Sequence, residues 1–175
     1  IGQANLTLSD GPTYSFGQIA NTSSIQKLVT ISNVGGFDAS SLIETTLVPP
    51  FRFSGGSFPG ANGTCPLTAI VAQGSSCLIE IEFAPTNYGT FNGALTFNYN
   101  NGSGNANVSI NLTGISQKPI VEITSPTVSD FINIANVTAF PVSGTCTENG
   151  QNVNLNLGGG AVVTNTPCAL GAWST

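Results

Sequence analysis

Two glutamates, Glu80 and Glu82, are the residues whose type and spacing could do chemistry in this sequence. A pair of carboxylates can act as general acid and base, and the same oxygens can help to hold a calcium ion. Acid catalysis would require both side chains over a cleft, with the pKa of one of them raised by burial or by its neighbour. Residues two apart share one face of a strand, and charged residues are rarely buried. The pattern therefore predicts a solvated strand face and no catalytic residue.

The sequence contains no histidine, which further limits the kinds of catalytic and metal site that it could form. Histidine is the commonest general base and the commonest transition-metal ligand in proteins. Methionine is absent as well, so a catalytic site would have to be built from carboxylates, tyrosines or cysteines. We therefore expect no enzymatic activity and no cofactor, with calcium as the one ion to consider.

The four cysteines stand at positions 65, 77, 146 and 168 and form no Cys-x-x-Cys pair. Without histidine the usual mixed zinc sites cannot be built, so the pattern favours disulfides. Of the three possible connectivities we choose Cys65–Cys77 and Cys146–Cys168, because each pair then lies within one of the two segments described below. In the loop-entropy model, closing loops of this size contributes on the order of 3 kcal/mol. Disulfides indicate a periplasmic, cell-surface or secreted protein.

The charge balance argues against two classes of partner. Lys plus Arg total 3 against 8 for Asp plus Glu, which gives a formal charge of −5. A phosphate backbone is bound chiefly by clustered basic residues, and Lys27, Arg52 and Lys118 are far apart, so we expect no nucleic acid and no anionic membrane surface. No apolar run approaches the ~20 residues of a membrane span, so we expect no membrane insertion. The start at Ile1, with neither an initiator methionine nor a signal-peptide pattern, is typical of a mature or excised chain.

Alternation of apolar and polar residues predicts strands along most of the chain. The clearest run is residues 77–83, in which Cys77, Ile79, Ile81 and Phe83 share one face. Further alternating runs cover residues 25–32, 95–99 and 108–112. Turn-forming residues separate these runs, and 21 glycines with 10 prolines argue against helices. The chain is predicted to be all-β, with the strand spacing of a sandwich or barrel.

A change in composition at "GISQKPIVEITSP" predicts a domain boundary near residue 117. One strand ends at Gly114, a short polar stretch with Pro119 follows, and a new strand begins with "IVEIT", as in tandem β-domains. The resulting domains are residues 1–117 and 118–175. The second contains roughly five predicted strands, fewer than the ~7 of a complete immunoglobulin-like sandwich. We therefore expect two tandem immunoglobulin-like β-sandwiches, the second of them incomplete.

The first segment carries a set of short motifs: Phe16-Gly17, Asn33-Val34-Gly35-Gly36, Gly74-Ser75-Ser76-Cys77, and Phe83-Ala84-Pro85 followed by Tyr88-Gly89. With these motifs, residues 4–115 resemble the Hydin-like (ASH) immunoglobulin domain, which bacteria carry in large surface proteins of the choice-of-anchor D type. The resemblance implies a sandwich akin to major sperm protein, a bond between the cysteines that match Cys65 and Cys77, and no catalytic residue.

The second segment contains "VEITSP", "VSGTCTENGQNVNLNL" and "CALGAWST". It is similar to bacterial Ig-like repeats of long extracellular adhesins, in which Cys146 and Cys168 match the usual cysteine pair. Such repeats continue after the tryptophan with further strands. The favoured interpretation is a truncated domain; the alternative is a domain incomplete by design, which accepts a strand from a neighbour.

The remaining candidate site residues are aromatic or acidic. Tyr88 and Phe91 are placed in the turn after Pro85, where they could contact a ligand, whereas Tyr99 and Trp173 are predicted to lie in the cores. For calcium the candidates are Glu122, Asp130 and Glu148, the acids nearest the boundary and the loops of the second domain. They are sparse against the six to eight oxygens that calcium takes.

The function predicted from these patterns is non-enzymatic. We expect a tandem Ig-like region of a bacterial cell-surface or secreted protein, acting in adhesion or as a structural spacer. Its partners would be a protein or glycan at a cell surface, or neighbouring subunits. One alternative is a subunit of an extracellular filament assembled by strand donation, and another is a glycan-binding accessory module of a secreted hydrolase.

Overall fold

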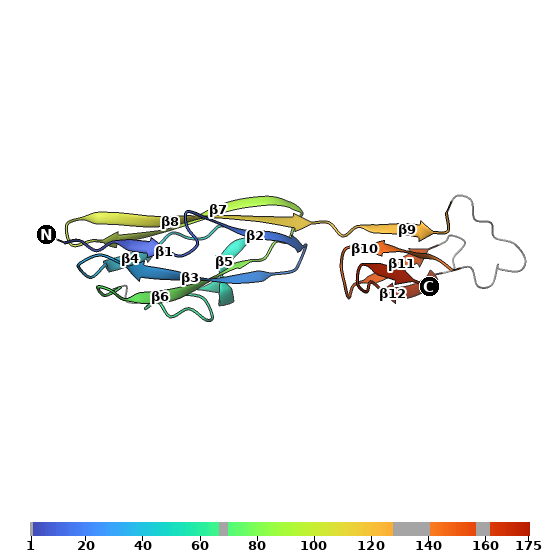
Figure 1. Cartoon of the computed structure of the whole chain (residues 1–175), viewed down its shortest axis with the longest axis horizontal. Coiled ribbons are helices and arrows are strands. Elements are labelled where there is room, and N and C mark those ends of the chain that lie inside the picture. Colours follow the sequence, from blue (N-terminus) through green and yellow to red (C-terminus); the bar gives the residue numbers. More distant parts are fainter. Residues whose placement is uncertain (1, 67–69, 128–140, 157–161) are drawn as a thin grey trace, which may run out of the picture. The chain divides into compact units, whose positions relative to one another are not determined.

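The computed structural model describes residues 2–66, 70–127, 141–156 and 162–175 (Figure 1). The chain divides into two compact units, Ile1–Gln117 and Lys118–Thr175. The described residues form strands, with one short 3-10 turn, η1, at Ser54–Gly56. The expectation of an all-β protein is confirmed.

The first unit is a sandwich of two four-stranded sheets, drawn as two layers in Figure 1. One sheet has the order β1-β3-β6-β5, with bounds Leu6–Leu8, Ile25–Asn33, Ser76–Phe83 and Phe51–Phe53. The other has the order β2-β8-β7-β4, with bounds Thr13–Ala20, Asn105–Gln117, Gly89–Asn100 and Ser40–Glu44. Neighbouring strands are antiparallel except β2 and β8, which run parallel.

The alternating sequence accounts for the core between these sheets. On β6 the inward residues Cys77, Ile79, Ile81 and Phe83 are all buried. They face the alternating apolar residues of the second sheet: Leu95, Phe97 and Tyr99 on β7, and Ile110 and Leu112 on β8. Burial of side chains of this size is worth about 1.5 to 3 kcal/mol each, which makes this layer the main source of stability.

Two glycines allow large aromatic rings to fill one end of this core. The Phe51 and Phe83 rings stack with their centroids 5.1 Å apart. A Cβ atom at Gly93 on β7 would lie 2.8 Å from the Phe51 ring, and one at Gly114 on β8 would lie 2.6 Å from the Phe83 ring. The rings of one sheet therefore rest directly on the backbone of the other.

The Asn33-Val34-Gly35-Gly36 motif has a structural role. The side chain of Asn33 is almost fully buried, and its Oδ1 accepts hydrogen bonds from the backbone N–H groups of Asn5 and Gly35. Its Nδ2 donates to the carbonyls of Phe37 and Val71. One side chain thereby ties together three segments at this end of the sandwich.

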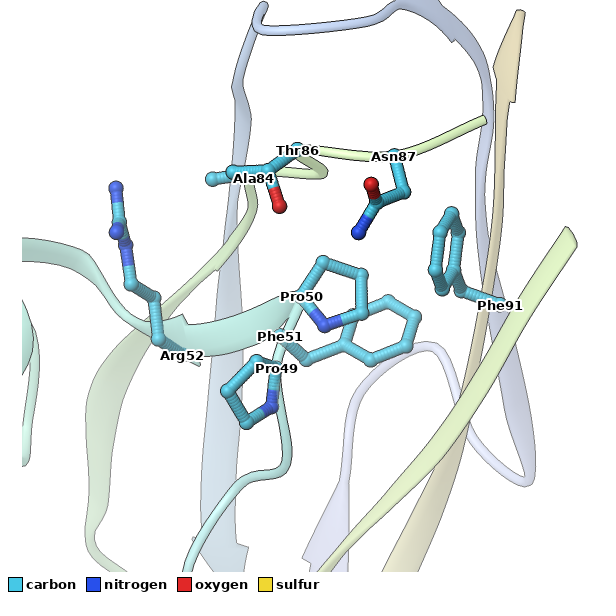
Figure 2. Close-up of a pocket in the computed structure, with 8 residues that line it drawn as sticks. All are labelled: Pro49, Pro50, Phe51, Arg52, Ala84, Thr86, Asn87 and Phe91. Atoms are coloured by element: carbon cyan, nitrogen blue, oxygen red, sulfur yellow. The ribbon is translucent and has the colours of Figure 1, made fainter. Parts of the chain in front are cut away.

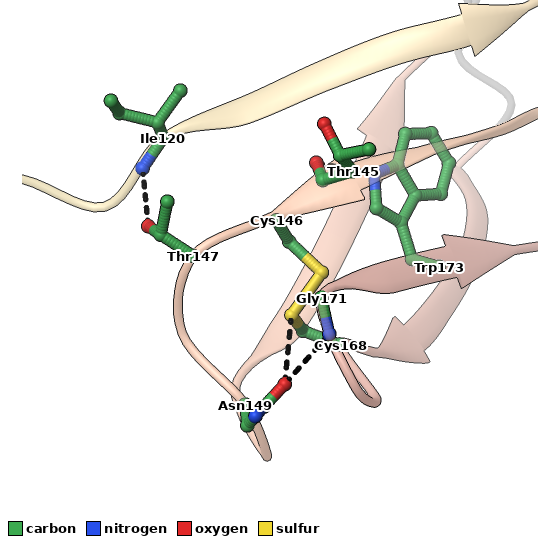
Figure 3. The surroundings of a disulfide bond; sticks show 8 residues. All are labelled: Ile120, Thr145, Cys146, Thr147, Asn149, Cys168, Gly171 and Trp173. Atoms are coloured by element: carbon green, nitrogen blue, oxygen red, sulfur yellow. Dashed lines mark hydrogen bonds between the residues drawn. A yellow bond between two sulfur atoms is a disulfide. The ribbon is translucent and has the colours of Figure 1, made fainter.

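The second unit has two smaller sheets. A three-stranded sheet has the order β13-β10-β9, with bounds Ala172–Ser174, Ser143–Cys146 and Val121–Ser125, and β11 (Asn152–Asn156) pairs with β12 (Val162–Pro167). In the ranges of this unit that the structure describes, the buried apolar residues are Val142, Cys146, Val153, Leu155, Cys168 and Trp173. The Trp173 indole N–H donates to the carbonyl of Thr145 at 3.2 Å (Figure 3). Tyr99 and Trp173 thus both lie in cores, as the sequence predicts.

Candidate functional site

The two glutamates that could form a carboxylate pair are buried, so the expectation of a solvated strand face was wrong. Glu80 is 4% exposed and Glu82 is 7% exposed. Both lie on the outer face of β6. The loop that follows η1, the covering loop, passes over Glu80, where a Cβ atom at Gly60 would lie 2.8 Å from the Cβ of Glu80. The carbonyl of Pro59 accepts a hydrogen bond from the backbone N–H of Glu80 at 2.8 Å, which fastens the loop to the strand.

Asn62, in this covering loop, binds the carboxylate of Glu80. Its Nδ2 donates to Oε1 at 2.9 Å and its backbone N–H donates to Oε2 at 3.2 Å. These bonds favour the charged form, so the hydrogen bond from the Asn62 side chain lowers the pKa of Glu80 below its ordinary value of 4.5.

Glu82 is held between the two strands that flank β6. Its partners in the ladders are Gln26 on β3 and Arg52 on β5. The Nε of Arg52 donates to Oε2 of Glu82 at 2.7 Å. This bond lowers the pKa of Glu82 below 4.5 and outweighs the opposing effect of burial.

The geometry of the pair therefore favours structure over acid–base chemistry. A general acid needs a raised pKa, whereas both carboxyls have lowered values. Among the described residues no buried side-chain nitrogen or oxygen lacks a hydrogen-bond partner, and each glutamate has a partner of its own, Asn62 for Glu80 and Arg52 for Glu82.

The acidic residues proposed for calcium do not converge on one site. Glu122 is exposed on β9 and Glu148 lies in the turn after β10, whereas Asp130 lies outside the described residues. Within the described ranges, no three His, Cys, Asp or Glu residues are grouped as metal ligands would be.

The two aromatic candidates have different environments. Tyr88 is 53% exposed in the bend after Pro85, as the sequence indicated. Phe91 lies on β7 and not in the turn, because the pairing of β7 with β8 extends back to Gly89↔Ser116. Phe91 is half-buried, and its ring centroid is 5.9 Å from that of Phe83.

A cavity of about 250 Å³ lies beside Phe91 at this end of the first sandwich. Two segments far apart in sequence form it, and its lining residues are Pro49, Pro50, Phe51, Arg52, Ala84, Thr86, Asn87 and Phe91. In Figure 2 the ring of Pro50 lies between Arg52 and Phe91, and the amide of Asn87 points toward Pro50. The arrangement offers a ligand an apolar floor and several hydrogen-bonding groups.

Sequence reasoning found Phe91 but missed the other residues around this cavity. The Pro49-Pro50 pair directly before "FRF" and the polar Thr86-Asn87 pair beside Tyr88 were the available signals. Neither signal predicts that the two segments lie together, because that follows from the pairing of β5 with β6.

Both predicted disulfides are present in the structure, Cys65–Cys77 and Cys146–Cys168. The first joins the covering loop to β6, where the backbone N–H groups of Thr64 and Cys65 also donate to the carbonyl of Leu78. The second closes the core of the small unit. Beside it, Oδ1 of Asn149 accepts from the backbone N–H of Gly171 at 2.9 Å (Figure 3).

The edge strand β9 leaves apolar side chains uncovered. Val121 and Ile123 pair with Cys146 and Gly144 on β10, so they point to the same face of the sheet as these buried residues. They are nevertheless 50% and 54% exposed.

In the part of the chain that the structure describes, no helix has the length and apolarity needed to cross a membrane.

Comparisons with known proteins place the first unit among Ig-like domains. Residues 6–114 match the family model of the HYDIN/CFA65/VesB-like Ig-like domain, and no curated protein sequence matches the chain. The structure is similar to that of the Vibrio cholerae VesB protease, with a TM-score of 0.52 and 13% identity, over 63% of this chain and 32% of that chain. The chain thus spans about a third of the VesB chain, and at this identity the likeness shows the fold alone.

Two other solved structures are similar. The ASH/PapD-like domain of human CEP192 (PapD-like domain 7) has a TM-score of 0.48 and 13% identity, over 65% of this chain and 85% of that domain. The secreted serine protease VesC of Vibrio cholerae has a TM-score of 0.39 and 13% identity, over 79% of this chain and 31% of that chain.

Proposed function

The chain belongs to the HYDIN/CFA65/VesB-like Ig-like domain family through residues 6–114, and we propose that it acts without catalysis, as a tandem Ig-like region serving adhesion or spacing. The observation that carries the proposal is the pair of compact β units, each with its own disulfide, that follow one another along the chain. Sandwiches of this kind serve many functions, so the sites on them decide the role.

The link between the two units supports the spacing role. Strand β8 ends at Gln117 and β9 begins at Val121, which leaves residues 118–120 between them. The carbonyl of Gln117 accepts from the backbone N–H of Asn21, and the N–H of Ile120 donates to the Thr147 hydroxyl at 3.0 Å. The units are thus joined by a short linker that contains Pro119, a residue with a fixed φ.

The disulfides fit a secreted or surface domain, because such bonds persist in oxidising compartments. We place the protein outside the bacterial cell or on its surface, with the periplasm as a further possible compartment. Within this proposal the first unit is of the choice-of-anchor D type and the second is a bacterial Ig-like repeat of surface adhesins. The partners are then a protein or glycan at a cell surface, and the low content of charged residues limits nonspecific electrostatic attachment.

Two measurements test the proposal. The first is native mass spectrometry of the 175-residue chain with and without reductant, and the second is an adhesion assay with beads coated with the chain. A monomer with two intact disulfides is the expected species. Retention of the beads on protein or glycan surfaces would indicate adhesion, and a lack of retention would leave spacing as the role. Turnover of peptide, ester or glycoside substrates by the purified chain would refute the non-enzymatic proposal.

The exposed apolar residues of β9 favour a second candidate, a filament subunit completed by strand donation. Val121 and Ile123 point toward the core side of their sheet but are half exposed, and an added strand could cover them. A ladder of masses separated by one chain would support this candidate. Replacing Ile123 with Lys should then abolish the ladder while leaving the monomer folded.

The family to which VesB belongs favours a third candidate, an accessory module of a secreted hydrolase. Such a module would bind a glycan while a separate domain performed hydrolysis. This candidate would require sugar affinity that is lost on replacement of Phe91 or Tyr88, and a chain without sugar affinity would exclude it.

A further inference from the structure

We propose that the cavity lined by Pro50, Arg52, Asn87 and Phe91 binds a single neutral pyranose ring. The inference rests on the adhesion role proposed above and names the chemical class of its ligand. These residues and their neighbours in the lining form what we call the Pro50–Phe91 cavity.

The apolar part of the Pro50–Phe91 cavity matches the C–H face of a sugar ring. Pro49 and Pro50 contribute compact apolar rings, and the half-buried Phe91 contributes an aromatic face. The position of Phe91 is fixed by its contact with Phe83, which is itself fully buried. A ligand would therefore meet a preformed surface and would lose little free energy in ordering it.

The polar part of the cavity consists of side chains that a ligand can reach. Thr86 and Asn87 are both exposed and line the cavity, so the Thr86 hydroxyl and the Asn87 side-chain amide are accessible to a ligand. A carboxamide can donate and accept at once, which suits the hydroxyls around a pyranose. Arg52 uses its Nε on Glu82, and its side chain is 58% exposed, so its Nη groups remain able to donate.

The charges around the cavity favour a neutral sugar over an acidic one. The cation of Arg52 is already paired with the buried carboxylate of Glu82 at 2.7 Å, so the pair has no net charge. The chain as a whole carries −5, which repels an anionic ligand. The cavity of about 250 Å³ is also smaller than the roughly 300–1,000 Å³ of sites for drug-sized ligands, which fits one ring and not an oligosaccharide.

Saturation-transfer difference NMR on the 175-residue chain tests this inference. The probes are methyl β-D-glucopyranoside, methyl β-D-galactopyranoside and N-acetylglucosamine, with glucuronic acid as the charged counterpart. We expect transfer to the ring protons of at least one neutral probe, with weak affinity in keeping with a single small ring. Asn87→Ala should weaken that binding roughly threefold to tenfold, the effect of one lost hydrogen bond.

Phe91→Leu is the second variant, because it keeps an apolar side chain against Phe83 but removes the aromatic face. We expect it to weaken binding by a similar factor, with an unchanged circular dichroism spectrum. Tyr88→Ala is the matched control, since Tyr88 is exposed and does not line the cavity, and it should bind as the unmodified chain does.

Three results would overturn the inference: no transfer to any neutral probe, stronger transfer to glucuronic acid, or unchanged binding by both Asn87→Ala and Phe91→Leu. None of them would refute the proposed function, because a folded monomer without sugar affinity still serves as a spacer. Catalytic turnover by the chain would refute the function independently of the cavity.

Discussion

The guanidinium Nε of Arg52 and Oε2 of Glu82 lie 2.7 Å apart across the β5–β6 ladder, and the carboxylate is buried. The pair connects the stability of the first unit with its candidate binding site. Glu82 is buried on the outer face of β6, and Arg52 lines the Pro50–Phe91 cavity. A substitution of Arg52 is therefore expected to change both the free energy of unfolding of the first unit and the binding of a ligand in the cavity.

Arg52→Ala is expected to lower the free energy of unfolding of the first unit by about 1 to 2 kcal/mol, because Glu82 would remain buried without its cation. The value is below that for a fully buried ion pair, since the Arg52 side chain is 58% exposed. Urea unfolding followed by tyrosine fluorescence measures it, because the tyrosines of the chain all lie in the first unit, at positions 14, 88 and 99.

Lys27→Ala provides the comparison for Arg52→Ala. Lys27 pairs with Asp10 at 2.8 Å, but both side chains are more than a quarter exposed. The expected loss is below about 1 kcal/mol, as for other surface ion pairs. If Lys27→Ala were more destabilising than Arg52→Ala, the importance assigned to the Glu82 pair would be wrong.

The stability of the first unit should decrease in acid because of Glu80 and Glu82. Their pKa values are lowered in the folded state by Asn62 and Arg52, respectively. The unfolded chain therefore binds these protons more tightly, so the contribution to stability is present above about pH 4.5 and is lost as the pH falls through the folded-state values. Urea unfolding at a series of pH values from neutral to strongly acidic measures the slope.

The Glu80→Gln/Glu82→Gln double variant isolates this effect. It should start from a lower stability but should show a shallower dependence on pH below about 4.5, because two of the linked protons are gone. An unchanged slope would mean that other carboxyls, such as Asp10, account for the acid sensitivity.

The alternating pattern predicts the strands because it reflects local geometry. In residues 77–83 the apolar side chains occupy one face, and this face is the core face of β6. The same pattern wrongly predicts that Glu80 and Glu82 are solvated. Their cover comes from Asn62, 18 residues upstream, and from Arg52, 30 residues upstream, and periodicity within one strand cannot report such partners.

The Pro50–Phe91 cavity could be predicted only in part for the same reason. Phe91 can be recognised in the sequence as an aromatic residue near a turn. The proline pair and Arg52 lie beside it because β5 pairs with β6. Strand register is set by many contacts at once, and a single sequence does not specify it well enough to place two loops together.

Gly114→Ala is expected to destabilise the first unit by about 1 to 3 kcal/mol through overpacking. The added methyl group would lie 2.6 Å from the Phe83 ring, which is fully buried and stacked on Phe51, so the ring cannot move without disturbing the core. Gly104→Ala is the matched control, because no atom lies within 4 Å of the position that its Cβ would take. It should change stability by less than about 0.5 kcal/mol. Equal effects of the two substitutions in urea unfolding would contradict this account of the core.

Loss of the Cys146–Cys168 disulfide should unfold the second unit while the first stays folded. Among its described residues the small unit has few buried apolar side chains, and closing the loop between these cysteines contributes about 3 kcal/mol in the loop-entropy model. Trp173 is the only tryptophan in the chain and is buried beside the disulfide, so its fluorescence reports on this unit alone. We expect a red shift of its emission in the Cys146→Ala/Cys168→Ala variant at neutral pH without denaturant.

The Cys65→Ala/Cys77→Ala variant tests whether this effect is specific to the second unit. The first unit has a much larger apolar core, so it should stay folded with reduced stability, and the emission of Trp173 should not change. A Trp173 spectrum unaffected by loss of Cys146–Cys168 would show that residues 118–175 hold together through packing alone. In that case the unit would be stable with Val121 and Ile123 exposed, and it would not need an added strand to cover them.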